Sequence, residues 1–117
     1  FGIKNIALSP QCVDPYNPKT VRSAMGAHFL VTIQKKIELS IFKKTHTIIG
    51  ANFEGLNAST YVFSDKCVLV LGNEAHGISD QNQNCIEEYI FIDKIGSGNS
   101  LNVSAAGSIL MYLMMKC

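Results

Sequence analysis

Residues 67–71 form a continuous apolar run, Cys-Val-Leu-Val-Leu, which follows Lys66 and ends at Gly72. Such a run is typical of a central strand in a parallel sheet, because both faces of that strand are covered by other parts of the chain. Residues 89–92, Tyr-Ile-Phe-Ile, repeat this character. The chain is therefore expected to fold around a buried sheet that contains these two strands.

The rest of the chain alternates between short apolar segments and segments with helical periodicity. Asn17 followed by Pro18 is a strong helix start, since Asn17 can accept hydrogen bonds from the first free amides, and Gly26 is the natural stop. Residues 34–44 show the period of an amphipathic surface helix, and residues 101–116 are apolar nearly all round. Further strands are predicted at residues 6–8 (buried), 29–33 and 45–51, followed by a mostly irregular segment at 52–65. This alternation predicts an α/β fold with a mostly parallel sheet flanked by helices.

Composition excludes several classes of protein. The chain has 117 residues, the usual size of one domain, and no linker rich in Pro, Gly or Ser divides it. With 47% apolar and 16% charged residues it is too hydrophobic to be disordered. Its longest apolar stretch, residues 109–115, is shorter than the roughly 18 residues needed to cross a bilayer. The net charge of +1 provides no strongly basic field, so a local patch or another segment would have to hold any nucleic acid.

The cysteines give no sign of a disulfide framework or a metal site. No C-x-x-C pair and no histidine at ligand spacing occurs among the four of them, Cys12, Cys67, Cys85 and Cys117. We interpret them as reduced, structural thiols of an intracellular protein, and expect no metal.

A glycine-bracketed polar turn, residues 72–77, follows the first apolar run directly. Ligands in open α/β sheets gather at the carboxyl ends of strands, so this position favours a binding site. Gly72 and Gly77 permit a close approach of the backbone to a ligand, and Glu74 places a carboxylate at the strand end. The alternative is a structural loop in which Ser79 caps the next helix.

A second glycine-rich turn lies between residue 92 and the terminal helix. Gly96 and Gly98 form a G-x-G pair, but Leu101 stands where a dinucleotide fingerprint has its third glycine. Ser100 has a good structural explanation as the cap of the last helix. The same explanation is available for Asn102, although it is weaker there.

Together with the helix at Pro18, these two turns resemble the SpoU (TrmH) family of SPOUT RNA methyltransferases over nearly the whole chain. The family helix Pro-x-x-x-Arg-x-Ser-Met-Gly-Ala is similar to residues 18–27, with Ala24 in the register where the family has its serine. Residues 72–77 match a Gly-Asn-Glu-x-x-Gly turn, and residues 100–104 match Ser-Leu-Asn-Val-Ser, which is highly specific for the family.

The resemblance implies a trefoil-knotted α/β fold, in which the C-terminal helix passes through a loop and S-adenosylmethionine sits in the knot. It implies cofactor contacts through backbone groups and apolar packing at Leu71, Gly72, Ile92, Ile95 and Leu101. It also implies a catalytic side lined by Glu74, Ser100 and Asn102, of which Asn102 is the strongest candidate.

The implied reaction is methyl transfer to a ribose 2′-hydroxyl of rRNA or tRNA, with rRNA favoured. In this family the proton is thought to be removed by an arginine of an Asn-x-Gly-x-x-x-Arg segment. Residues 1–3, Phe-Gly-Ile, resemble the residues just after that segment, so we expect the first strand and the arginine to lie outside residues 1–117. The alternative function is a catalytically inactive knotted subunit that binds RNA or serves assembly.

The family resemblance also implies a homodimer, because SPOUT proteins usually pair through the knot region and the apolar helix at residues 101–116 needs covering. No membrane partner is expected. The compartment, cytoplasm or mitochondrion, stays open.

Overall fold

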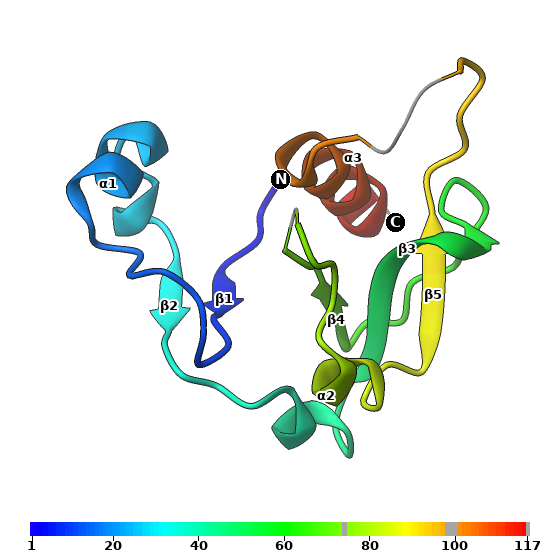
Figure 1. Cartoon of the computed structure of the whole chain (residues 1–117), viewed down its shortest axis with the longest axis horizontal. Coiled ribbons are helices and arrows are strands. Elements are labelled where there is room, and N and C mark those ends of the chain that lie inside the picture. Colours follow the sequence, from blue (N-terminus) through cyan, green and yellow to red (C-terminus); the bar gives the residue numbers. More distant parts are fainter. Residues whose placement is uncertain (74, 98–100, 117) are drawn as a thin grey trace. The chain divides into compact units, whose positions relative to one another are not determined.

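The computed structural model describes residues 1–73, 75–97 and 101–116 (Figure 1). Two compact units are formed, one by Gly2–Ile41 and the other by Phe1 together with the chain from Phe42 onward. Each unit has its own parallel sheet. The expected single domain over residues 1–117 stays a prediction.

The smaller unit is built on two short parallel strands and one capped helix. β1 (Asn5–Ala7) pairs with β2 (Thr32–Gln34), with Asn5 opposite Thr32. Between them lie α1 (Pro18–Ala24) and the 3-10 helix η1 (Ala27–Phe29). All residues of β1 are exposed, so the prediction of a buried strand at residues 6–8 is wrong for its burial.

The predicted start and stop of α1 are confirmed. Asn17 Oδ1 accepts a hydrogen bond from Thr20 N at 2.9 Å, and Pro18 occupies the first helical position. The helix ends where Met25 and Gly26 adopt left-handed conformations with φ of 49° and 88°. Local signals therefore decide this element, because cap and stop residues act within one turn of their own position.

The predicted surface helix at residues 34–44 is wrong. Lys36 adopts a left-handed conformation with φ of 54°, which a continuous right-handed helix does not allow. Ile37 N donates to Leu8 O at 2.8 Å, so this amide bonds to a distant loop instead of to the residue four positions earlier. What remains helical is η2 (Leu39–Phe42), a 3-10 helix. The strand predicted at residues 29–33 is likewise shifted, since Phe29 belongs to η1 and β2 begins at Thr32.

The larger unit contains a three-stranded parallel sheet in which β3 (Thr47–Asn57) lies between β4 (Cys67–Val70) and β5 (Glu88–Phe91). β4 is therefore an edge strand among the described residues of this sheet, not the predicted central one. Its four residues are half-buried, whereas Ile48 and Ile49 of β3 are fully buried. The apolar sequence of β4 did not show whether this strand is central or at an edge, because β3 also begins with apolar residues, Ile48 and Ile49.

β3 is longer than predicted, because it runs on through an irregularity between Ala51 and Leu56 and then pairs with β5 again. Gly55 makes this possible. Its φ is 128°, and a Cβ there would overlap the carbonyl of Tyr89. The bulged residues were expected to form a loop, and they instead extend the strand beside the end of β5.

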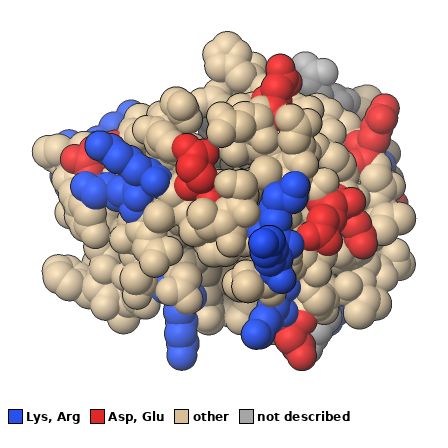
Figure 2. Space-filling view, turned by 90° about the horizontal axis from the view of Figure 1, so that it is seen from below, with Lys and Arg blue, Asp and Glu red and all other residues tan. Residues whose placement is uncertain are grey.

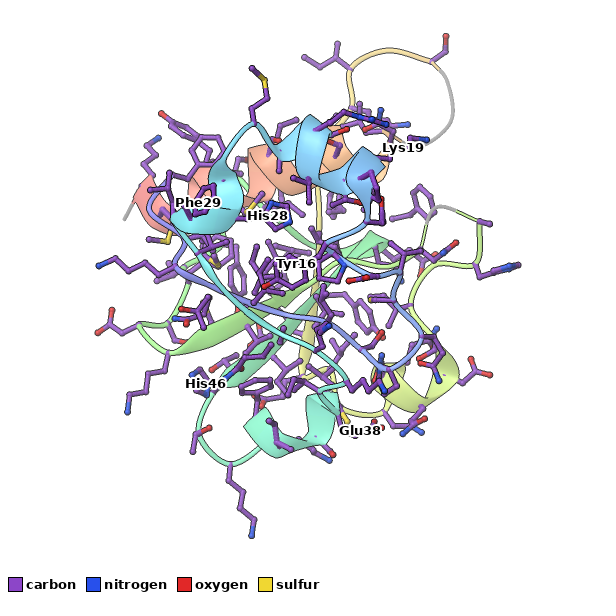
Figure 3. The ribbon with its side chains drawn as sticks, turned by 90° about the vertical axis from the view of Figure 1, so that its left-hand side faces the viewer. Tyr16, Lys19, His28, Phe29, Glu38 and His46 are labelled. Atoms are coloured by element: carbon purple, nitrogen blue, oxygen red, sulfur yellow. The ribbon has the colours of Figure 1, made fainter. Side chains whose placement is uncertain are left out.

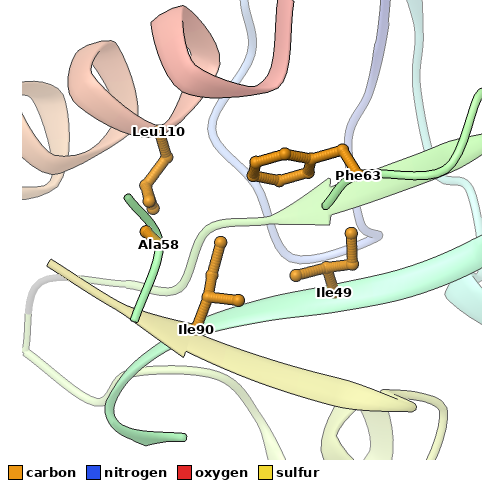
Figure 4. Packing of buried hydrophobic residues seen from close by; sticks show 5 residues of the cluster. All are labelled: Ile49, Ala58, Phe63, Ile90 and Leu110. Carbon is orange, nitrogen blue, oxygen red and sulfur yellow. The ribbon is translucent and has the colours of Figure 1, made fainter. Parts of the chain in front are cut away.

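The core of the larger unit lies between the sheet and α3 (Val103–Lys116). Figure 4 shows the buried cluster of Ile49, Ala58, Phe63, Ile90 and Leu110, with Leu110 supplied by α3. Full burial of one such large aliphatic side chain stabilises a fold by roughly 1.5–3 kcal/mol. The helix also packs closely at Gly107, where a Cβ would lie 2.8 Å from Leu71 Cδ1.

On the face seen in Figure 2, most of the surface is uncharged, and acidic and basic side chains are interspersed. Among the helices of the described chain, none is long and apolar enough to cross a membrane.

Candidate functional site

A cavity of about 1260 Å³ lies within the larger unit at the carboxyl ends of its strands. Its walls come from the irregular part of β3, the turn after β4, the end of β5 and the start of α3. Small-molecule pockets usually measure about 300–1,000 Å³, so there is room for a cofactor of nucleoside size. Parallel strands place their carboxyl ends at one edge, which brings these distant segments together.

The turn at residues 73–77 is closed by its own backbone. Asn73 N donates to Gly77 O at 2.9 Å, and Gly77 N donates to Asn73 O at 2.8 Å. Asn73 Oδ1 also accepts hydrogen bonds from Ala75 N at 2.7 Å and His76 N at 3.3 Å. The side chain of Asn73 therefore organises the turn, a role that the sequence analysis missed although an Asn that begins a turn is a known signal.

Four of the five predicted cofactor residues line the cavity, namely Leu71, Gly72, Ile92 and Leu101. The fifth, Ile95, is not among the described lining residues, and its side chain is fully exposed. It lies in the irregular segment that leaves β5 after Phe91. The structure therefore brings together the residues that directly end strands or precede α3.

Asn102 is the predicted catalytic residue that the structure places at the cavity. Its Oδ1 accepts a hydrogen bond from Ala105 N at 2.8 Å, so it caps α3. From the sequence, this structural role was expected to be weaker for Asn102 than for Ser100, yet the geometry provides it. The cap uses only the oxygen of the amide, and the Nδ2 group can still donate to a ligand. Glu74 and Ser100 lie outside the described residues.

The residues that sequence reasoning missed include two on β3. Asn52 and Phe53 line the cavity from the irregular part of β3. Asn52 Oδ1 accepts a hydrogen bond from Phe53 N at 2.7 Å, which holds the backbone locally. The signal available in the sequence was a polar residue followed by Gly55 directly after a β-branched strand, a pattern that suggests a bulge.

The ionisable side chains among the described lining residues are His76 and Lys94. Among all the residues that the structure describes, no three His, Cys, Asp or Glu side chains are arranged to hold a metal ion. Within residues 1–73, 75–97 and 101–116, the groups with shifted pKa values do not line the cavity. Burial, followed by a hydrogen bond with Glu88, raises the pKa of Tyr61 to about 12, and burial raises the pKa of the Cys67 thiol.

Comparison with known proteins identifies a family that the chain matches. The model of the SpoU rRNA Methylase family matches residues 1–112. The 23S rRNA (guanosine(2553)-2′-O)-methyltransferase RlmP of Bacillus subtilis (strain 168) is 27% identical over 117 residues, which cover 95% of this chain and 47% of that protein.

Solved structures show the same fold. A putative RNA methyltransferase of the TrmH family from Porphyromonas gingivalis superimposes with a TM-score of 0.88 at 27% identity, covering 98% of this chain and 49% of that one. The SpoU methyltransferase AviRb from Streptomyces viridochromogenes, solved in complex with the cofactor AdoMet, has a TM-score of 0.86 at 21% identity, with 98% and 50% covered.

The chain thus spans about half the length of each of these three proteins. The predicted SPOUT-type α/β fold with parallel strands and flanking helices is confirmed, and the knot stays a prediction. From its match to the family model over residues 1–112, the chain belongs to the SpoU rRNA methylase family.

Proposed function

We propose that the chain is the cofactor-binding part of an S-adenosylmethionine-dependent RNA 2′-O-ribose methyltransferase. The observation that carries this is the cavity where two family turns, separated by more than twenty residues, meet at Gly72, Leu101 and Asn102. Membership of the SpoU rRNA methylase family supports the same proposed function.

The residues present fit this cofactor. Leu71, Ile92 and Leu101 offer apolar surface for the faces of an adenine ring, and the backbone beside Gly72 offers donors and acceptors for its edge. When bound, the cofactor supplies an activated methyl group on a sulfonium sulfur. Leu71 also packs close to Gly107 of α3, where a Cβ would lie 2.8 Å from its Cδ1.

On the catalytic side, Asn102 would donate from Nδ2 toward the ribose, and its capping bond would fix the orientation of that amide. A 2′-hydroxyl is a weak nucleophile until its proton is removed. In this family the base is thought to be the arginine of an Asn-x-Gly-x-x-x-Arg segment, a pattern that does not occur in residues 1–117. Glu74 and Ser100 complete the proposed site.

The test is calorimetric titration of the full protein with S-adenosylhomocysteine, together with methylation of ribosomal RNA. Asn102→Asp retains a capping oxygen but loses the amide donor, whereas Asn102→Ala loses both. We expect methylation to fall at least about tenfold in both variants, with unfolding stability reduced by about 1 kcal/mol only in Asn102→Ala. A wild type that does not bind S-adenosylhomocysteine would refute the proposed function. An Asn102→Asp variant that methylates RNA as well as the wild type would remove Asn102 from the site.

The second candidate is a knotted RNA-binding or assembly subunit without catalysis. The capping bond of Asn102 favours it, because that bond alone accounts for an Asn at this position. A wild type that binds RNA and S-adenosylhomocysteine but transfers no methyl group would select this candidate.

We also propose a homodimer that acts on ribosomal rather than transfer RNA. The support for pairing is the side of α3 left exposed in the single chain, where Ile109, Tyr112 and Met115 are 39%, 53% and 44% exposed. Light scattering that finds only monomer would contradict the dimer, and equal methylation of transfer RNA would contradict the preference for ribosomal RNA.

The described cysteines Cys12, Cys67 and Cys85 are free thiols, which supports a reducing compartment, either cytoplasm or mitochondrion.

A further inference from the structure

The smaller unit contains a hollow of its own, of about 180 Å³, in the loop that follows β1. Two neighbouring lysines, Lys35 and Lys36, form part of its wall. The loop after β1 supplies the other lining residues, among them Ser9, Cys12 and Asp14. This hollow shares no residue with the cofactor cavity.

Backbone hydrogen bonds hold the two lysines against that loop. Leu8 N donates to Gln34 O and Ile37 N donates to Leu8 O, both at 2.8 Å, so the loop is tied on either side of the lysine pair. Lys36 has the left-handed φ of 54°. A non-glycine residue keeps this conformation only where the surrounding structure holds it, and such residues cluster at ligand sites.

An aromatic ring positions one of the lysines. Lys35 Nζ lies 5.5 Å from the centroid of the Tyr16 ring, within cation–π distance. Tyr16 packs against His28 with the ring centroids 5.4 Å apart, and His28 Nε2 lies 2.6 Å from Pro15 O (Figure 3). Tyr16, which is half-exposed, is thus packed against His28.

Charge is distributed unevenly between the two units. Residues 2–41 carry five Lys or Arg and two Asp or Glu, whereas the rest of the chain carries five and seven. Two basic residues and one acidic residue, Asp14, line the hollow, and Asp14 Oδ1 already accepts a hydrogen bond from Tyr16 N at 3.0 Å. The residues that line the hollow thus carry a formal excess of one positive charge, equal to the net charge of the whole chain.

We propose that this hollow binds a backbone phosphate of the RNA substrate, an inference that rests on the proposed methyltransferase function. Lys35 and Lys36 supply the charge, and the Ser9 hydroxyl, 3.3 Å from Cys12 Sγ, is a neutral donor beside them. Tyr16 is a positioning residue that orients Lys35. Contacts of this kind fix the register of the RNA and read no sequence.

The experiment measures binding of a fluorescein-labelled single-stranded RNA of mixed sequence to the full protein by anisotropy over a series of salt concentrations. The variant Lys35→Ala/Lys36→Ala is compared with Lys43→Ala/Lys44→Ala, which removes two neighbouring exposed lysines elsewhere. Loss of two phosphate contacts should weaken binding about tenfold at 0.1 M salt and flatten the salt slope by about 1.4. The control pair should leave both values nearly unchanged.

Two further variants separate positioning from folding. Tyr16→Phe keeps the ring under Lys35 and should bind RNA like the wild type, whereas Tyr16→Ala should bind about threefold to fivefold more weakly. S-adenosylhomocysteine affinity, measured on every variant, shows that the cofactor cavity is intact.

The proposal is overturned if the Lys35/Lys36 variant loses no more affinity or salt slope than the control pair, or if Tyr16→Phe binds as weakly as Tyr16→Ala. A wild type that binds neither RNA nor S-adenosylhomocysteine refutes the proposed function itself. Loss of RNA binding in the Lys35/Lys36 variant with unchanged cofactor affinity supports the phosphate site.

Discussion

At the scale of single residues, the two glycines that bracket the cavity turn are required for different physical reasons. At Gly72 a Cβ would lie 2.7 Å from Ile78 N and 2.8 Å from Gly77 O, so the obstacle is backbone that cannot move without opening the turn. Gly77 has open space around it, and its requirement is the left-handed φ of 67°.

This difference predicts unequal effects of the same substitution. Gly77→Ala should cost about 1–2 kcal/mol of unfolding free energy and leave the turn in place. Gly72→Ala should displace the turn and weaken S-adenosylhomocysteine binding at least about tenfold. Chemical denaturation and calorimetry on both variants check this, and an undiminished affinity of Gly72→Ala would contradict the role given to the turn.

Tyr61 makes a prediction about pH. Burial and the Glu88 carboxylate raise its pKa from 10.0 to about 12 in the folded state. The unfolded chain therefore releases the phenolic proton first, so the stability linked to this group is present below pH 10 and is lost as the pH rises toward 12. Tyr61→Phe keeps the edge-to-face contact with Phe63, whose centroid is 4.8 Å away, and removes the titration.

Denaturation between pH 9 and 12 should accordingly show a steeper fall in unfolding free energy for the wild type than for Tyr61→Phe. Parallel curves for the two proteins would show that the phenol does not titrate in this window.

At the scale of elements, β3 depends on its irregularity to reach the cavity. Gly55→Ala places a Cβ against the carbonyl of Tyr89 in a conformation that L residues rarely adopt. We expect a loss of more than about 1 kcal/mol in unfolding free energy, together with weaker cofactor binding because Asn52 and Phe53 share the bulge. Gly96→Ala, at a glycine with open space around it, is the matched control. Equal stability of the two variants would show that the bulge tolerates a side chain.

The elements also differ in how well they could be predicted from the sequence. The limits of α1 were predictable because Asn17, Pro18 and Gly26 act through bonds within one turn. The segment at residues 34–44 was not, because its outcome depends on Lys36 and on a bond from Ile37 to the distant Leu8. The place of β4 at a sheet edge also depends on pairing between distant strands, which apolar content alone does not encode.

The candidate site follows the same division. Gly72, Leu101 and Asn102 were predictable because they belong to family turns that directly end a strand or begin a helix. Asn52 and Phe53 were missed because only the pairing of β3 with β5 on both sides of the bulge brings them to the cavity. Ile95 was assigned from its place in a motif, whereas its side chain is fully exposed.

At the scale of the whole molecule, the exposed side of α3 predicts how copies associate. Tyr112 is 53% exposed and touches Phe1 edge-on, with ring centroids 6.1 Å apart. Tyr112→Lys would bring a charge into an apolar contact, so the dissociation constant of the dimer should rise at least about tenfold. Val62→Lys removes an apolar residue that is 84% exposed elsewhere, and it should leave association unchanged. Light scattering over a dilution series decides, and identical curves for both variants would place the interface away from α3.

The capping bond of Asn102 has a consequence for how occupation of the cavity could be observed. One amide side chain both holds the first turn of α3 and faces the cavity, so the fraying of that turn and the filling of the cavity are energetically linked. The backbone N–H of Ala105 then acts as a built-in reporter. Its hydrogen exchange should slow when a ligand restrains Asn102, before any product is made.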